Sequence, residues 1–132
     1  MSELFSEAWF EGFGRQWNAE PGLADALAKI DFDSNVAYGF TGEDTPRGVL
    51  EVKKGFVEKT GPFTGQALNW DIRYAKEGWE AWMKKPPTMM NIGVAYTTGK
   101  MKFIVGDYAA MIRDPRMAGP FIKSFAAMAK VA

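Results

Sequence analysis

The chain is 132 residues long, which suits one domain built around a single hydrophobic core. Sixteen basic residues balance sixteen acidic ones, so no net charge draws the protein to nucleic acid. With no cysteine and no histidine, the chain lacks disulfides, the usual zinc ligands and the base of an ordinary Ser-His-Asp triad. We therefore predict one domain over residues 1–132, with no metal, no cofactor and no nucleic-acid partner.

The N-terminal part of the chain predicts two helices and then a strand. Ser2 is placed to cap a first helix, whose aromatic side chains recur every four residues at Phe5, Trp9, Phe13 and Trp17. A second, shorter helix is expected over residues 23–30. From Ile30 to Phe40 the apolar side chains fall largely on alternate residues, which is typical of a half-buried strand.

The middle of the chain predicts further strands. Residues 48–54 and 56–60 surround Gly55 and form either a hairpin or one bulged strand. Residues 67–74 alternate between an apolar and a polar face, and we expect Asp71 and Arg73 to form a surface ion pair on the latter. Because the strands follow one another without helices between them, we predict the α+β class, with an antiparallel sheet of about five strands and all helices on its dry face.

The last third of the chain returns to helices around one more strand. A helix over residues 76–85 ends at Pro86-Pro87, and Thr88 caps a short helical segment after it. A strand over 101–105 follows, and Asp107 then caps another short helix.

The final helix begins with the cap and first-position signals of Asp114-Pro115. Pro120 complicates this helix, because proline has no amide donor and its ring clashes with the preceding turn. We therefore expect the regular part of the helix to begin at Pro120.

Two motifs that suggest catalysis or phosphate binding are weak. The segment from Gly93 to Met101 superficially resembles a phosphate-binding loop, but it has five residues between its glycines and no Ser or Thr after the lysine. Asp31 and Asp33 share a strand face at a spacing used by paired carboxylates, yet exposed carboxylates usually serve only to solvate a surface. An enzyme would depend on Asp31, Asp33 or Tyr96 as its acid or base, and we expect none.

Methionine and aromatic residues gather in the second half of the chain. Seven of the eight methionines follow residue 82, and this flexible side chain suits surfaces that accept varied apolar partners. The pattern indicates either an irregular core or an apolar cavity. The residues we predict as cavity walls are Trp79, Trp82, Met83, Met89, Met90, Tyr96, Met101, Phe103, Met111, Phe121, Phe125 and Met128.

The order of elements and one long run of residues resemble the sterol carrier protein 2 family of lipid-binding domains. The run is Ala95-Tyr96-x-x-Gly99-Lys100-Met101-Lys102-x-x-x-Gly106-Asp107. The resemblance extends over essentially the whole chain, including Trp17-Asn18 and the strand Asn69-Trp70-Asp71-Ile72. It implies helices over one face of an antiparallel sheet and a hydrophobic tunnel for fatty acid, acyl-CoA, phospholipid or sterol. The family has no shared catalytic residues.

The chain departs from the family pattern in two places. Val131-Ala132 stands where the eukaryotic carriers have a Ser-Lys-Leu peroxisomal signal, and the segment 85–90 replaces a small, glycine-containing turn. We expect a cytoplasmic, non-catalytic protein that binds and carries a lipid or another apolar small molecule. The alternative is an interaction or dimerisation module that packs the same apolar surface on a partner enzyme. A homodimer and transient membrane contact remain open at this point.

Overall fold

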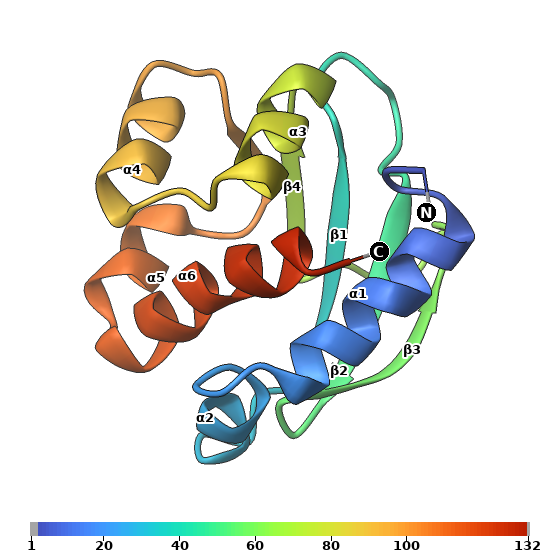
Figure 1. The fold of residues 1–132 in the computed structure, drawn as a ribbon, viewed down its shortest axis with the longest axis vertical. Coiled ribbons are helices and arrows are strands. Elements are labelled where there is room, and N and C mark those ends of the chain that lie inside the picture. Colours follow the sequence, from blue (N-terminus) through green and yellow to red (C-terminus); the bar gives the residue numbers. More distant parts are fainter. Residues whose placement is uncertain (1–2, 132) are drawn as a thin grey trace.

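The computed structural model describes residues 3–131, which form a five-stranded sheet and six helices (Figure 1). The elements in chain order are α1 Glu7–Ala19, α2 Ala24–Ala28, β1 Ser34–Phe40, β2 Gly48–Lys53, β3 Phe56–Gly61, β4 Trp70–Tyr74, α3 Lys76–Lys84, α4 Met89–Thr97, β5 Lys102–Val105, α5 Tyr108–Arg113 and α6 Pro115–Ala129. The predicted α+β class is confirmed. No described helix is long and apolar enough to cross a membrane.

The strand order is β3-β2-β1-β4-β5, and the sheet is mixed. Three neighbouring pairs are antiparallel, whereas β1 and β4 run parallel, with Val36 opposite Trp70 and Tyr38 opposite Ile72. The predicted antiparallel sheet of about five strands is confirmed for most of the sheet, and the pairing of β1 with β4 is the exception. The physical reason is the connection 62–69, which passes β2 and β1 before β4 begins and so lets β4 run in the direction of β1.

The helices cover one face of the sheet, with α1 in front of β2 and β3 and α3 in front of β4 (Figure 1). Aromatic side chains from both layers build the core. Phe13 of α1 meets the ring of Tyr38 at 5.4 Å between centroids, and Trp79 of α3 meets the same ring at 5.9 Å. These three rings are almost completely buried, so the core lies between α1, α3 and the middle of β1.

The first helix begins later than predicted. Its cap is Ser6, whose hydroxyl accepts a hydrogen bond from the Trp9 amide at 3.2 Å, while Ser2 lies outside the described residues. Phe5 precedes the helix at a positive φ of 65°, yet its ring is buried and stacks on Phe10 at 5.3 Å. The aromatic stripe is confirmed as core, with Phe10 as an additional member.

A tight hairpin joins β2 to β3 through Lys54 and Gly55, both at positive φ. The hairpin is thus confirmed and the alternative of one bulged strand is wrong. A register shift between Glu51 and Val52 adds a bulge within the hairpin. Gly55 lies directly against α2, and its carbonyl accepts a hydrogen bond from the Trp17 indole at 3.0 Å. The turn therefore anchors both N-terminal helices to the sheet.

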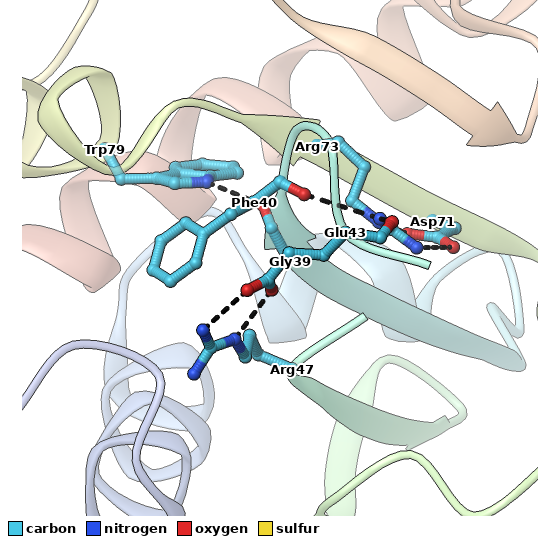
Figure 2. A network of polar contacts seen from close by, with 7 residues as sticks. All are labelled: Gly39, Phe40, Glu43, Arg47, Asp71, Arg73 and Trp79. Atoms are coloured by element: carbon cyan, nitrogen blue, oxygen red, sulfur yellow. Dashed lines mark hydrogen bonds and ion pairs between the residues drawn. The ribbon is translucent and has the colours of Figure 1, made fainter. Parts of the chain in front are cut away.

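The expected surface ion pair of Asp71 and Arg73 is buried, which corrects the prediction. Each residue is only 3 % exposed, and Arg73 donates to the two carboxylate oxygens at 2.6 and 3.0 Å. The guanidinium also donates to the Glu43 carbonyl at 2.7 Å, because the loop 41–47 folds over this face of the sheet (Figure 2). The middle of the face opposite the helices is thus covered by chain and is not wet, whereas the Glu51–Lys59 ion pair of β2 and β3 is open to solvent.

The other loop on that face is the connection 62–69. Asn35, which projects from β1 on the side of Asp71, donates its side-chain amide to the Ala67 carbonyl at 2.9 Å. Ala37 and Val49 share this side and are buried. The loops 41–47 and 62–69 therefore cover the middle of the sheet on the side away from the helices.

The final helix also differs from the prediction, since α6 runs without interruption from Pro115 and contains Pro120. The carbonyl that Pro120 leaves without an amide partner belongs to Arg116, in the first turn, where a helix bends at low cost. The ring of Pro120 is buried, which offsets part of that cost. The predicted caps Asp114, Asp107 and Thr88 are confirmed by hydrogen bonds to Arg116, Ala110 and Asn91.

The buried ion pair yields a stability prediction. Asp71→Asn keeps the shape of the side chain but leaves the Arg73 charge without its counter-ion, which costs about 3 kcal/mol. The matched control is Asp114→Asn, which retains a capping side chain and disturbs an exposed ion pair that contributes little to stability. Urea denaturation measures both, and equal losses would contradict the assigned role of the buried pair.

The hairpin turn yields a second prediction. In Gly55→Ala the new methyl group would collide with the backbone of Ala24 and Ala28, in addition to the strain of positive φ. We expect a loss of about 3 kcal/mol in the free energy of unfolding. Gly42→Ala has a similar φ with open space around it and should lose only about 1 kcal/mol. Thermal and urea unfolding measure the loss of stability in each variant. Equal losses would disprove the predicted collision of the new methyl group in Gly55→Ala with α2.

Candidate functional site

An apolar cavity lies between α6 and the helix-covered face of β1 and β4. It offers about 40 Å³ to a water-sized sphere. Side chains from six elements and their flanks enclose it: Trp17, Leu23, Leu27, Phe32, Val36, Tyr38, Trp70, Ile72, Met111, Met117, Pro120, Phe121 and Ser124. Since no side chain in this set carries a charge at neutral pH, the cavity suits an apolar ligand.

The sheet supplies the floor of the cavity through the parallel pairing. Val36 and Tyr38 of β1 lie beside Trp70 and Ile72 of β4 in register, and all four project toward the helices. The roof is α6, where Met117, Pro120, Phe121 and Ser124 recur at the spacing of one helix face. Two parts of the chain that are distant in sequence thus meet across the cavity.

Two hydroxyl groups belong to the otherwise apolar wall. Burial raises the pKa of Tyr38, so its phenol stays neutral and able to donate a hydrogen bond. The Ser124 hydroxyl donates to the Phe121 carbonyl at 2.5 Å, within the same helix. Tyr38 is therefore the better candidate for a polar contact with a ligand.

A larger hollow of about 490 Å³ adjoins the cavity and forms its mouth. The two share Phe32, Trp70, Met111 and Met117. The rest of the mouth has five polar side chains, from Asp33, Ser34, Asn69, Asp107 and Asp114, together with Gly106 and Ala110. No lysine or arginine lines it. The mouth therefore presents negative charge to an entering molecule.

The three carboxylates at the mouth also hold the backbone. Asp33 accepts from the Lys54 amide at 2.7 Å, and Asp107 accepts from the Ala110 amide at 3.0 Å. Side-chain hydrogen bonds from Arg116 lower the pKa of Asp114, so this carboxylate stays ionised. The charge of Asp114 is paired with Arg116, whereas Asp33 and Asp107 have no ion-pair partner among residues 3–131.

The predicted wall residues are dispersed in the structure. Two of them, Met111 and Phe121, line the cavity. The fully buried ones are in the core: Trp79, Met101, Phe125 and Met128. The partly buried ones pack against the core: Trp82, Met83 and Phe103. The exposed ones are on α4: Met89, Met90 and Tyr96. Their contact with a ligand stays a prediction.

Six of the thirteen cavity residues come from the first half of the chain, where the sequence analysis predicted no cavity wall. The alternation of Phe32, Val36 and Tyr38 was the available signal, because it places them on one strand face. The partners of these residues could not be found by periodicity. Trp70 joins them only through the parallel pairing, and Met117 only through the fold of α6.

The carboxylate pair proposed for an enzyme lacks the predicted strand geometry. Strand β1 begins at Ser34, whereas Asp31 precedes it in a turn with a φ of 49°. Tyr96, the other acid or base candidate, stacks on Tyr108 at 4.2 Å between ring centroids. Over residues 3–131, no group of three or more acidic, histidine or cysteine side chains is placed to hold a metal ion.

The arrangement of an α+β domain with an apolar cavity between helices and sheet has clear counterparts among solved structures. The crystal structure of sterol carrier protein 2 aligns with a TM-score of 0.76 and 19% identity, over 98% of this chain and 100% of that one. The solution structure of the conserved hypothetical protein TT1886 from Thermus thermophilus gives 0.73 and 18%, over 98% and 90%. UbiJ-SCP2, a ubiquinone synthesis protein, gives 0.58 and 10%, over 93% and 90%.

No protein-family model matches the chain, and no curated protein matches it. Because the sequence identities are only 10% to 19%, these solved structures establish the fold of the chain alone. The chain has the fold of sterol carrier protein 2, and the resemblance predicted from the sequence is confirmed at that level.

Proposed function

We propose that the protein binds and carries an apolar small molecule, without catalysis, in the cavity under α6. The observation that carries the proposal is a wall of apolar and neutral side chains at the interface of helices and sheet. The likeness to a structure named sterol carrier protein 2 supports it. Each buried methylene would contribute about 0.8 kcal/mol, so a hydrocarbon chain gains affinity without a charged anchor.

Ligand entry requires the cavity to widen. Its volume of about 40 Å³ is far below the roughly 300 to 1,000 Å³ of ordinary ligand pockets. The roof is suited to move, because α5 has only six residues and Pro120 removes a hydrogen bond from the first turns of α6. Met111 and Met117 can also change rotamer at low cost. The ligand would displace α5 and the start of α6 from β4.

The acidic mouth favours an uncharged ligand. A fatty acid carboxylate or the phosphates of acyl-CoA would approach three carboxylates, of which only Asp114 has a basic partner, Arg116. No basic side chain offsets the repulsion at Asp33 and Asp107. A sterol or a long-chain alcohol or ester avoids this cost and could accept a hydrogen bond from Tyr38. Of the ligands that the sequence resemblance implies, the neutral ones fit best.

The interaction-module alternative has less support at the apolar surface of the terminal helix α6. Phe125 is only 1% exposed, and Phe121 is partly buried against the core. These side chains are occupied within the folded chain, which favours the carrier function over packing of the terminal helices on a partner.

Blocking the mouth tests the binding site. Met117→Trp places a larger ring where the mouth meets the cavity, and we expect a fluorescent polyene alcohol to bind about tenfold more weakly. Met89→Trp makes the same exchange on α4, away from both hollows, and should bind as the parent chain does. Native mass spectrometry of the purified protein should detect a neutral lipid. Absence of both lipid and alcohol binding would reject the function.

Removing charge at the mouth tests the ligand class. Asparagine caps helices as well as aspartate, so Asp107→Asn and Asp114→Asn keep both caps. We expect the double variant to bind a polyene fatty acid about fivefold more tightly at low salt, because like-charge repulsion is relieved. Affinity for the matching alcohol should stay the same. A parent chain that prefers the acid to the alcohol would overturn the neutral-ligand assignment while leaving the carrier function standing.

A further inference from the structure

The helix α4 is largely apolar, with Asn91 and Thr97 as its polar side chains, yet one side of it is open to solvent. A helix with this composition is ordinarily buried. Ile92 and Ala95 face the protein and are buried, whereas Met90 is 76% exposed and Val94 is 56% exposed. Met89, at 41%, adds to the same helix surface. These three side chains, here called the α4 patch, have nothing over them in the described part of the chain.

Positive charge flanks the α4 patch at both ends of the helix. Lys84 and Lys85 precede α4, Lys100 and Lys102 follow it, and all four are exposed. Between residues 81 and 106 the sequence contains no acidic residue. None of the five ion pairs found among residues 3–131 uses these lysines. The patch is therefore an apolar surface inside a local excess of four positive charges.

We propose that the α4 patch docks on an anionic lipid bilayer, with Met90 and Val94 entering the boundary between headgroups and acyl chains. The helix would lie in the plane of the surface, since a helix of nine residues is too short to span the bilayer. The four lysines match the negative surface charge, and their long stems let them reach the headgroups while the apolar side chains insert.

The composition of the patch favours a bilayer over a protein partner. Protein interfaces are depleted in lysine, and their strongest contacts come from tryptophan, tyrosine and arginine. Methionine is common at protein interfaces too, but the patch has no tryptophan, tyrosine or arginine, and its rim consists of lysine. The inference goes beyond the carrier function and does not depend on it, because no residue of the α4 patch lines the cavity or its mouth.

Vesicle sedimentation of the full chain tests the charge. We expect binding to phosphatidylserine–phosphatidylcholine vesicles that weakens with salt, and little binding to phosphatidylcholine alone. Removing two charges in the double variant Lys84→Gln, Lys85→Gln should weaken binding about thirtyfold. The control removes the neighbouring pair of the hairpin in Lys53→Gln, Lys54→Gln and should bind as the parent does. Equal loss in both would overturn the proposal.

A second pair of variants tests insertion. Met90→Ser with Val94→Ser should weaken vesicle binding at least tenfold while leaving thermal unfolding unchanged, because both side chains are exposed. The control Phe56→Ser alters another exposed apolar side chain, in β3, and should have no effect on vesicle binding. The bilayer proposal would be rejected if the parent chain failed to bind anionic vesicles and formed dimers. If Met90→Ser with Val94→Ser also made that dimer monomeric, the patch would be the interface with a second copy of the chain.

Discussion

The parallel pairing of β1 with β4 is the constraint on which the rest of the structure depends. It sets Val36 and Tyr38 beside Trp70 and Ile72, and these four side chains form the floor of the cavity. It also requires residues 62–69 to pass two strands, which covers the face away from the helices. An antiparallel β4 would reverse the order of its side chains along β1. The parallel pairing thus accounts both for the floor of the cavity and for the position of residues 62–69 over the other face of the sheet.

The middle of β1 is held from both faces, and this gives the cavity a rigid base. On the helix side, the Trp79 indole donates to the Gly39 carbonyl at 2.9 Å. On the other side, Arg73 binds Asp71 and the carbonyl of Glu43, which fastens the loop 41–47 (Figure 2). A buried ion pair is weak evidence of stability by itself. The geometric effect of Arg73 is clearer, because its hydrogen bond to the Glu43 carbonyl ties β4 to the loop that follows β1. The sheet is therefore fixed, and any widening of the cavity must occur at α5 and α6.

Local chemistry could be predicted from the sequence, whereas long-range pairing could not. The caps Asp107, Asp114 and Thr88 act on amides two or three residues away, so short patterns identify them. The burial of Arg73 depends on a loop some thirty residues distant in sequence, which alternation along one strand cannot reveal. The methionine bias indicated the second half of the chain, and two side chains from there, Met111 and Met117, line the cavity. On α4 the same bias marks an exposed surface instead.

Aromatic contacts of Tyr96 join the two proposed sites, and the shortest of them is with Tyr108. Tyr96 of α4 stacks on Tyr108 of α5 at 4.2 Å, and α5 carries Met111 into the cavity while its cap Asp107 lies at the mouth. Such a stack is worth about 0.5 to 1.5 kcal/mol beyond burial, which is small beside the packing of the main core. If α4 settles on a bilayer, a shift of Tyr96 would act directly on α5. Because α5 is also the element that must move for the cavity to widen, membrane contact and ligand exchange would then share one mechanical path.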